Sequence, residues 1–189
     1  MDRFQIMKKA EEIEIGNALK NLPGNLATLI KESLDSKNPE KKLEARSTLV
    51  NMGKNIVPQM HKLVESKSDL LRMETAKIIE LISDRRSIPF FINLLDDKEF
   101  EIRWIAADGL INIGRRSILP LLISIRDGKS SLFFNKGAHH VLLALLNEKE
   151  RRKVKSLLVS LDNSQQLGEI APVEASNAIK LIFKRTNRT

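Results

Sequence analysis

A repeat with a period of 31 residues constrains the fold of this chain more than any other feature of its sequence. The period is marked by three prolines, Pro58, Pro89 and Pro120, and an aliphatic residue follows each of them five positions later. A repeat of this length corresponds to one small unit of secondary structure that buries too little apolar surface to fold alone. Neighbouring copies must therefore stack against one another to form a continuous core.

Residues 96–126 contain one complete copy of the repeat. Its first half has apolar residues at helical spacing, namely Ile102, Ala106, Leu110 and Ile113. Gly114 follows directly and suits a helix C-terminus. Pro120 then falls in the first turn of a second helix, where the missing N–H of proline costs nothing. The unit is therefore predicted to be two helices joined by a short turn.

The same pattern extends over most of the chain. Regular copies span 38–65, 69–95 and 99–126, an imperfect pair of helices precedes them, and a diverged copy covers 131–161. A final helix begins at Pro172 and should cap the apolar end of the last repeat with Ala175, Ala178, Ile179 and Phe183. No segment alternates with the period of a strand. We therefore predict an all-α, single-domain fold over residues 1–189, an α-α superhelix of about five two-helix repeats plus a C-terminal capping helix.

The register of the repeats predicts which side chains form the core. The expected core residues are Leu49, Ile79, Ile102, Ala106, Leu110, Ile113, Leu122, Ile125, Leu142 and Leu145. The register also places Lys42, Arg72 and Arg103 near one position of successive first helices. We expect these cations to bond to turn carbonyls or carboxylates and so to hold the stacking angle.

The central repeat resembles a known family. The segment EIRWIAADGLINIG at 101–114, followed by ILPLL at 118–122, is similar to the short HEAT-like repeats first named for phycobilin lyase subunits. The resemblance covers roughly residues 38–161, and the segment GAHHVL at 137–142 looks like one that follows such repeats in uncharacterised bacterial proteins. It implies a solenoid whose second helices line a concave surface, in a family whose members mostly bind other macromolecules.

Two enzymatic branches of the HEAT-like group can be compared with this chain. Deoxyhypusine hydroxylases hold a di-iron site with His-Glu pairs, but the histidines here are His61, His139 and His140, and none is followed by Glu. Alkylpurine DNA glycosylases use Trp and Asp on solenoid helices, and Trp104 and Asp108 lie four residues apart, close enough to share a helix face. Trp104 occupies the register of Leu43 and Met73, so we favour a packing role for it.

No motif predicts catalysis. His139 and His140 point about 100° apart on a helix and cannot chelate one metal ion together. We find no Gly-rich phosphate loop and no nucleophile elbow. We therefore expect no catalytic residue, no bound metal and no cofactor.

The turns inside the repeats are basic, and those between repeats are acidic. The basic residues are Lys54, Arg85, Arg86, Arg115, Arg116, Arg151, Arg152 and Lys153, in a chain with a net charge of +8. Acids at the starts of helices and bases at their ends complement the helix dipole, which explains the signs. The doubling of the cations leaves a second interpretation open, a ridge that binds a polyanion or an acidic protein.

The second helices carry one polar column, Lys62, Asn93, Ser124 and Ser156, which should face away from the core. Beside it, Ile92 and Ile123 are apolar in the two central repeats only. They are either buried by the curvature of the superhelix or form an apolar patch for a peptide.

These features predict a non-catalytic interaction scaffold that binds a protein partner, an acidic one by charge, through its concave face. The alternatives are a nucleic-acid-binding or glycosylase-like protein that uses the basic ridge, and a helper in cofactor attachment similar to phycobilin lyase subunits. Aromatic residues make up only 4% of the chain, which argues against a platform for stacked bases. The absence of cysteine is compatible with a cytoplasmic protein. The charged N-terminus and the short apolar runs predict neither a signal peptide nor a membrane helix.

Overall fold

The computed structural model describes residues 2–35, 37–162 and 170–183, and all regular secondary structure within them is helical. The chain divides into two compact units, residues 1–87 and 88–189. The all-α prediction is confirmed, whereas the single domain and the superhelix stay predictions. Among the described residues, no helix combines the length and apolar character needed to cross a bilayer.

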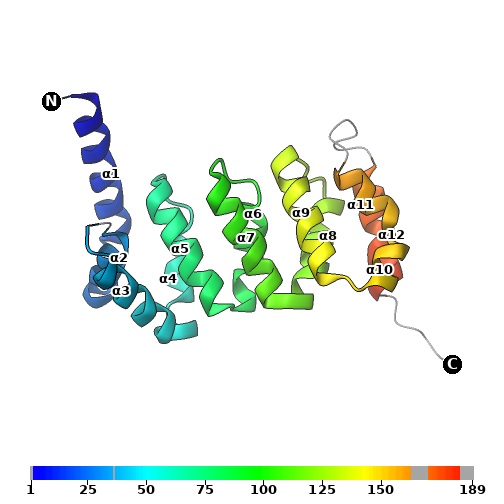
Figure 1. Cartoon of the computed structure of the whole chain (residues 1–189), viewed down its shortest axis with the longest axis horizontal. Helices are drawn as coiled ribbons and strands as arrows, with labels where there is room; N and C mark the ends of the chain where they lie inside the picture. The colour runs from blue at the N-terminus through cyan, green and yellow to red at the C-terminus, as the bar shows by residue number, and fades with distance from the viewer. Residues whose placement is uncertain (1, 36, 163–169, 184–189) are drawn as a thin grey trace. The chain divides into compact units, whose positions relative to one another are not determined.

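The first unit contains five α-helices and two short 3-10 turns (Figure 1). These elements are α1 (Arg3–Leu19), α2 (Gly24–Leu34), α3 (Pro39–Met52), η1 (Gly53–Asn55), α4 (Val57–Leu63), α5 (Asp69–Ile82) and η2 (Arg85–Ser87). Helix α3 packs against α2 and α5, and α4 packs against α5. A bidentate ion pair joins α3 to α5, because Arg46 donates to both carboxylate oxygens of buried Glu74 at 2.7 and 2.6 Å.

Within its described residues, the second unit contains seven α-helices (Figure 1). They are α6 (Ile88–Leu94), α7 (Phe100–Ile113), α8 (Ile118–Arg126), α9 (Leu132–Leu145), α10 (Glu148–Lys153), α11 (Lys155–Asp162) and α12 (Ala171–Phe183), with η3 (Gly114–Ser117) between α7 and α8. Helix α9 packs against α7 on one side and α11 on the other. The turn predicted within the diverged repeat is thus itself a short helix, α10.

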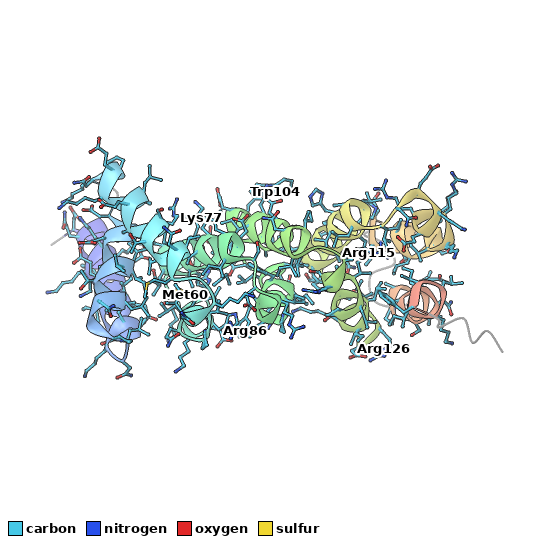
Figure 2. The ribbon with its side chains drawn as sticks, turned by 90° about the horizontal axis from the view of Figure 1, so that it is seen from below. Met60, Lys77, Arg86, Trp104, Arg115 and Arg126 are labelled. Carbon is cyan, nitrogen blue, oxygen red and sulfur yellow. The ribbon has the colours of Figure 1, made fainter. Side chains whose placement is uncertain are left out.

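The C-terminal part departs from the regular repeat. The two-helix pattern predicts that the second half of the diverged copy at 131–161 packs as a second helix, but α11 packs beside α9, while α12 packs along α8. Figure 2 shows α12, in salmon, in one row with α6 and α8 of the same unit. Ala175 and Ala178 of α12 are buried as predicted, whereas Ile179 is half-buried and Phe183 is exposed. The capping prediction is therefore wrong for Phe183, which lies at the last turn of the helix.

Local side-chain chemistry sets the helix ends. The side chains of Asn38, Ser68, Ser131 and Asn147 each accept a hydrogen bond from a backbone N–H of the helix that follows. Gly53 and Gly114 end α3 and α7 with φ of +61° and +82°, a region that glycine enters without a steric cost. Ser83 stands at the corresponding end of α5 and also has a positive φ, +51°.

The predicted core is confirmed at eight of its ten positions, all of them buried. The prediction is wrong for Ile113 and Leu145, which are half-buried. Both lie in the last residue of a helix, where the chain turns away from the packed face. Leu146, the next residue, adopts an extended conformation and is buried in place of Leu145.

The predicted role of the repeated cations is confirmed at two positions. Arg72 Nη1 donates to the carbonyl oxygens of Ser66 and Lys67 at 2.9 and 3.2 Å. Arg103 Nη1 makes the same contacts one repeat later, with the carbonyls six and five residues before it at 2.7 and 2.9 Å. Each arginine thus fixes the turn that enters its own helix.

Candidate functional site

The predicted basic turn of the first unit is largely tied to its own backbone and acids. Arg86 donates from Nε and Nη2 to the carboxylate of Asp84 at 3.0 and 3.1 Å, and from Nη2 to the carbonyl of Lys54 at 2.9 Å. The hydrogen bonds from Arg86 lower the pKa of Asp84 below its ordinary value. Arg85 is exposed, and its neighbour Arg86 is labelled in Figure 2. This turn therefore offers fewer free cations than its sequence suggests.

Several cations in the basic turns of the second unit are likewise paired with nearby carboxylates or carbonyls. Arg115 in η3 forms a bidentate ion pair with Glu150 of α10 at 3.0 and 2.6 Å, which lowers the pKa of that carboxyl. Arg152 pairs with Glu148, one helical turn before it. Arg151 Nε donates to the Leu146 carbonyl at 2.8 Å. In the described part of the chain, the side chains of Arg116 and Lys153 are exposed and form neither an ion pair nor a hydrogen bond.

The predicted second-helix column is at the surface, as expected. Lys62, Asn93 and Ser156 are exposed and Ser124 is half-buried. Its apolar neighbours are not available to a partner to the same degree, because Ile92 is buried and Ile123 is half-buried. Burial is therefore the better description of the central apolar residues, and the column lacks a large exposed apolar anchor.

The histidines do not form a metal site, and no group of three or more His, Cys, Asp or Glu side chains in the described residues could hold an ion. His61 Nε2 lies 3.0 Å from the hydroxyl of fully buried Ser87. Burial lowers the pKa of His61 and of His139, which favours the neutral ring in both. His140 is exposed and its ring contacts that of Trp104.

The prediction that Trp104 packs in the interior is wrong. Its side chain is 50% exposed, and Leu43, at the same register in α3, is 61% exposed. This register therefore lies on the outer face of the first helices. Figure 2 shows Trp104 projecting from α7 on the side away from α6 and α8.

Trp104 belongs to an exposed aromatic pocket of about 200 Å³ between α7 and α9. We call this feature the α7–α9 pocket. Its lining comprises Phe100, Arg103, Trp104 and Ala107 from α7, and Phe133, Lys136, Gly137 and His140 from α9. Phe100 is 63% exposed and Phe133 48% exposed, so three large rings of the pocket are presented to solvent.

The aromatic rings of the pocket contact one another and a cation. The indole of Trp104 stacks on Phe100 at a centroid distance of 6.4 Å, and the His140 ring is tilted against it at 5.0 Å. The guanidinium of Arg103 lies 4.0 Å above the Phe133 ring and 5.7 Å from that of Phe100. Such cation–π contacts favour a fixed position for both partners. Because Arg103 is also held by two carbonyls, it links the pocket to the turn that precedes α7.

Two glycines allow the helices of the pocket, α7 and α9, to pack closely against neighbouring side chains. A Cβ at Gly109 of α7 would lie 2.5 Å from the ring of buried Phe91 in α6. A Cβ at Gly137 of α9 would lie 2.8 Å from Leu95 Cδ2. Lys136 is oriented away from the pocket by its ion pair with Asp162 at 2.7 Å, so mainly its aliphatic stem is left to line the wall. The pocket is thus preorganised by packing below it.

The lining of this pocket combines aromatic rings with cations. Apolar and aromatic surfaces are at its centre and cations are at its edge, which suits an apolar side chain with polar neighbours. Asp108, which a glycosylase-like site would require beside Trp104, is half-buried and outside the pocket lining. The two residues therefore share a helix but not the cavity.

The spacing of aromatic residues in the sequence is a signal that indicates this site. Phe100 and Trp104 lie four residues apart on one helix, and Leu132 and Phe133 begin the helix that packs beside it. Comparison with profiles of known protein families gave no match, and comparison with curated proteins gave none either. The site is therefore argued from its geometry alone.

Proposed function

We propose that this chain is a non-catalytic interaction protein of the HEAT-like repeat type, which binds a protein partner through the α7–α9 pocket. The observation that carries the proposal is the exposure of three large aromatic rings around one cavity. Monomeric proteins seldom leave such a cluster in water unless a partner covers it.

The dimensions of the pocket favour a protein ligand. A volume of about 200 Å³ accommodates one large apolar side chain rather than a whole cofactor, since small-molecule sites usually measure roughly 300–1,000 Å³. Binding energy at protein interfaces is concentrated in a few Trp, Tyr and Arg residues in well-packed pockets. Trp104 and Arg103 have this composition and this setting.

The predicted second-helix column supports binding less well. Its exposed members are polar, and Ile92 beside it is buried, so a partner would find no apolar anchor there. We therefore move the proposed partner site from the second helices to the outer face of the first helices in the second unit. The helper role in cofactor attachment has no supporting observation among the described residues.

The HEAT-like assignment and the superhelical stacking of the repeats are part of this proposal. They are supported by the recurrence of one set of contacts at one register, since Arg72 and Arg103 bond to equivalent carbonyls and Gly53 and Gly114 end equivalent helices. Packing of successive first helices, α3 with α5 and α7 with α9, is the contact that a solenoid repeats.

The test compares Trp104→Ala with a matched control, Leu43→Ala. Both remove an exposed apolar side chain at the same register, but only the first lies in the α7–α9 pocket. Affinity capture followed by mass spectrometry should find a protein that the wild type and Leu43→Ala retain and Trp104→Ala loses. With that protein purified, calorimetry should show a loss of about 2 kcal/mol or more, roughly a 30-fold weaker Kd, for Trp104→Ala.

Two results would contradict the proposal. Capture of the same proteins by wild type and Trp104→Ala would separate binding from the pocket. Nuclease-sensitive capture of nucleic acid, weakened steeply by salt and unchanged in Trp104→Ala, would favour the basic turns and the nucleic-acid alternative.

A further inference from the structure

The geometry points to an extended acidic peptide as the ligand, which places a large apolar side chain in the α7–α9 pocket and carboxylates on the basic residues at the far ends of α7 and α9. This inference rests on the proposed function and specifies its partner. Three observations support it: the direction of the helices, the charge at their ends and the neutral residues of α7 between.

The pocket and the basic turns lie at opposite ends of the same two helices. Phe100, Arg103 and Trp104 are in the first turns of α7, and η3 follows the last turn. Ile111 lies seven residues after Trp104, a spacing that returns to the same side of α7. At 1.5 Å per residue, the end of α7 at Ile113, where η3 begins, is about 14 Å from Trp104 along the axis.

The far end is a cluster of cations built from two elements. The ion pair between Arg115 and Glu150 at 2.6 Å holds η3 against α10, and Lys153 is close enough to Glu150 to help lower the pKa of its carboxyl. We call Arg115, Arg116, Arg151 and Lys153 the basic cluster. Glu150 offsets only one of these four charges, and Arg116 and Lys153 are exposed and unpaired within the described residues.

Neutral residues of α7 continue from the pocket toward the far end of the helix. Ala107 lines the pocket beyond Trp104, and Ile111 follows at helical spacing. A nucleic acid strand carries a phosphate every few ångströms and would leave its middle charges unmatched over about 14 Å. A peptide can place neutral residues there. At about 3.3 Å per residue, an extended peptide covers this distance in roughly four residues. We therefore favour a peptide.

The experiment selects ligands from a phage-displayed library of random peptides of about twelve residues, long enough to span the distance when extended. The full chain is the bait, and the best peptide is then synthesised and titrated by fluorescence polarisation. We expect enriched sequences with a large apolar residue and Asp or Glu about four to six positions from it. Trp104→Ala should weaken binding about tenfold or more, and Leu43→Ala should leave it unchanged.

A double substitution, Arg116→Glu with Lys153→Glu, tests the acidic part of the ligand. Both side chains are exposed, so the fold should be retained, which circular dichroism checks. We expect about tenfold weaker binding at ~50 mM salt and a smaller difference at ~500 mM, because salt screens exposed charges.

The outcomes separate this inference from the proposed function. Peptides that depend on Trp104 but lack acidic residues, and that ignore the double substitution, would overturn the inference and leave the pocket as a protein site. Failure to enrich any peptide that depends on Trp104 would overturn both. A single-stranded oligonucleotide that binds more tightly than the best peptide, and is lost in the double substitution, would replace the peptide by a nucleic acid.

Discussion

Gly109→Ala should destabilise the protein, although the same change in a helix interior is usually favourable. Gly109 lies within α7 and is buried, and an added Cβ would meet three atoms of the Phe91 ring at 2.5, 2.7 and 2.7 Å. Carbon atoms in contact prefer separations of about 3.5–4.0 Å, so the ring would have to move by roughly 1 Å. Phe91 is fully buried, and side chains in a protein interior are closely packed, so its ring has little freedom to move.

The magnitude follows from two opposing effects. Alanine favours the helix over glycine by about 1 kcal/mol. Inserting a methyl group into a packed core costs about 1–3 kcal/mol, because neighbouring side chains are forced out of their preferred rotamers. With the contact at 2.5 Å, we place the cost near the upper end, which gives a net loss of about 1–2 kcal/mol in the free energy of unfolding.

Urea denaturation followed by circular dichroism measures this loss, and two further variants make the result specific. Gly16→Ala in α1 is the matched control, since its Cβ would meet nothing within 4 Å; it should be neutral or gain up to about 1 kcal/mol. Phe91→Leu removes part of the ring, so Gly109→Ala should cost less in that background. A Gly109→Ala protein as stable as the wild type, or no coupling to position 91, would refute the packing described for α6 and α7.

Three other predictions concern the turns. Ser83→Gly should raise the free energy of unfolding by about 0.5–1 kcal/mol in urea melts, because Ser83 has a left-handed φ that glycine adopts without strain. Asp84→Asn should destabilise most at neutral pH. Arg86 lowers the pKa of Asp84, so this stabilisation is present above about pH 4 and is lost as the pH falls through the native pKa; melts in which the difference persists at low pH would argue against it. Arg115→Gln should cost about 0.5–1 kcal/mol and Arg116→Gln nothing measurable in the same melts, because only Arg115 is paired.

The helices could be predicted from the sequence because they depend on local chemistry that repeats. Prolines in first turns, glycines at helix ends and apolar residues at helical spacing each act over a few residues, so periodicity alone places them. The bonds of Arg72 and Arg103 were also predictable, since both reach carbonyls of the turn just before their own helix. The packing of α11 beside α9 and of α12 along α8 could not be predicted. It depends on which helix packs beside α8 after the repeat has diverged.

The α7–α9 pocket could not be predicted in the same way, because register fixes a helix face but does not say what covers that face. We assigned Trp104 to packing by analogy with Leu43, and both proved to be exposed. The register was correct, and the assumption that a large apolar residue in it must be buried was wrong. What distinguishes the two residues is the neighbouring helix, because Phe133 and His140 of α9 line the same cavity as Trp104.

The doubled cations of the turns now have a physical explanation that does not require a polyanion. In a short 3-10 turn, successive side chains point about 120° apart, so only one of two adjacent arginines can face a given acid. The position of the acid selects which one. Asp84 precedes its pair and bonds to the second arginine, Arg86, whereas Glu150 comes from α10 and bonds to the first, Arg115. The other member of each pair is left at the surface. In the described part of the second unit, the exposed arginine, Arg116, follows the helix whose first turns line the aromatic pocket, so a ligand could use both.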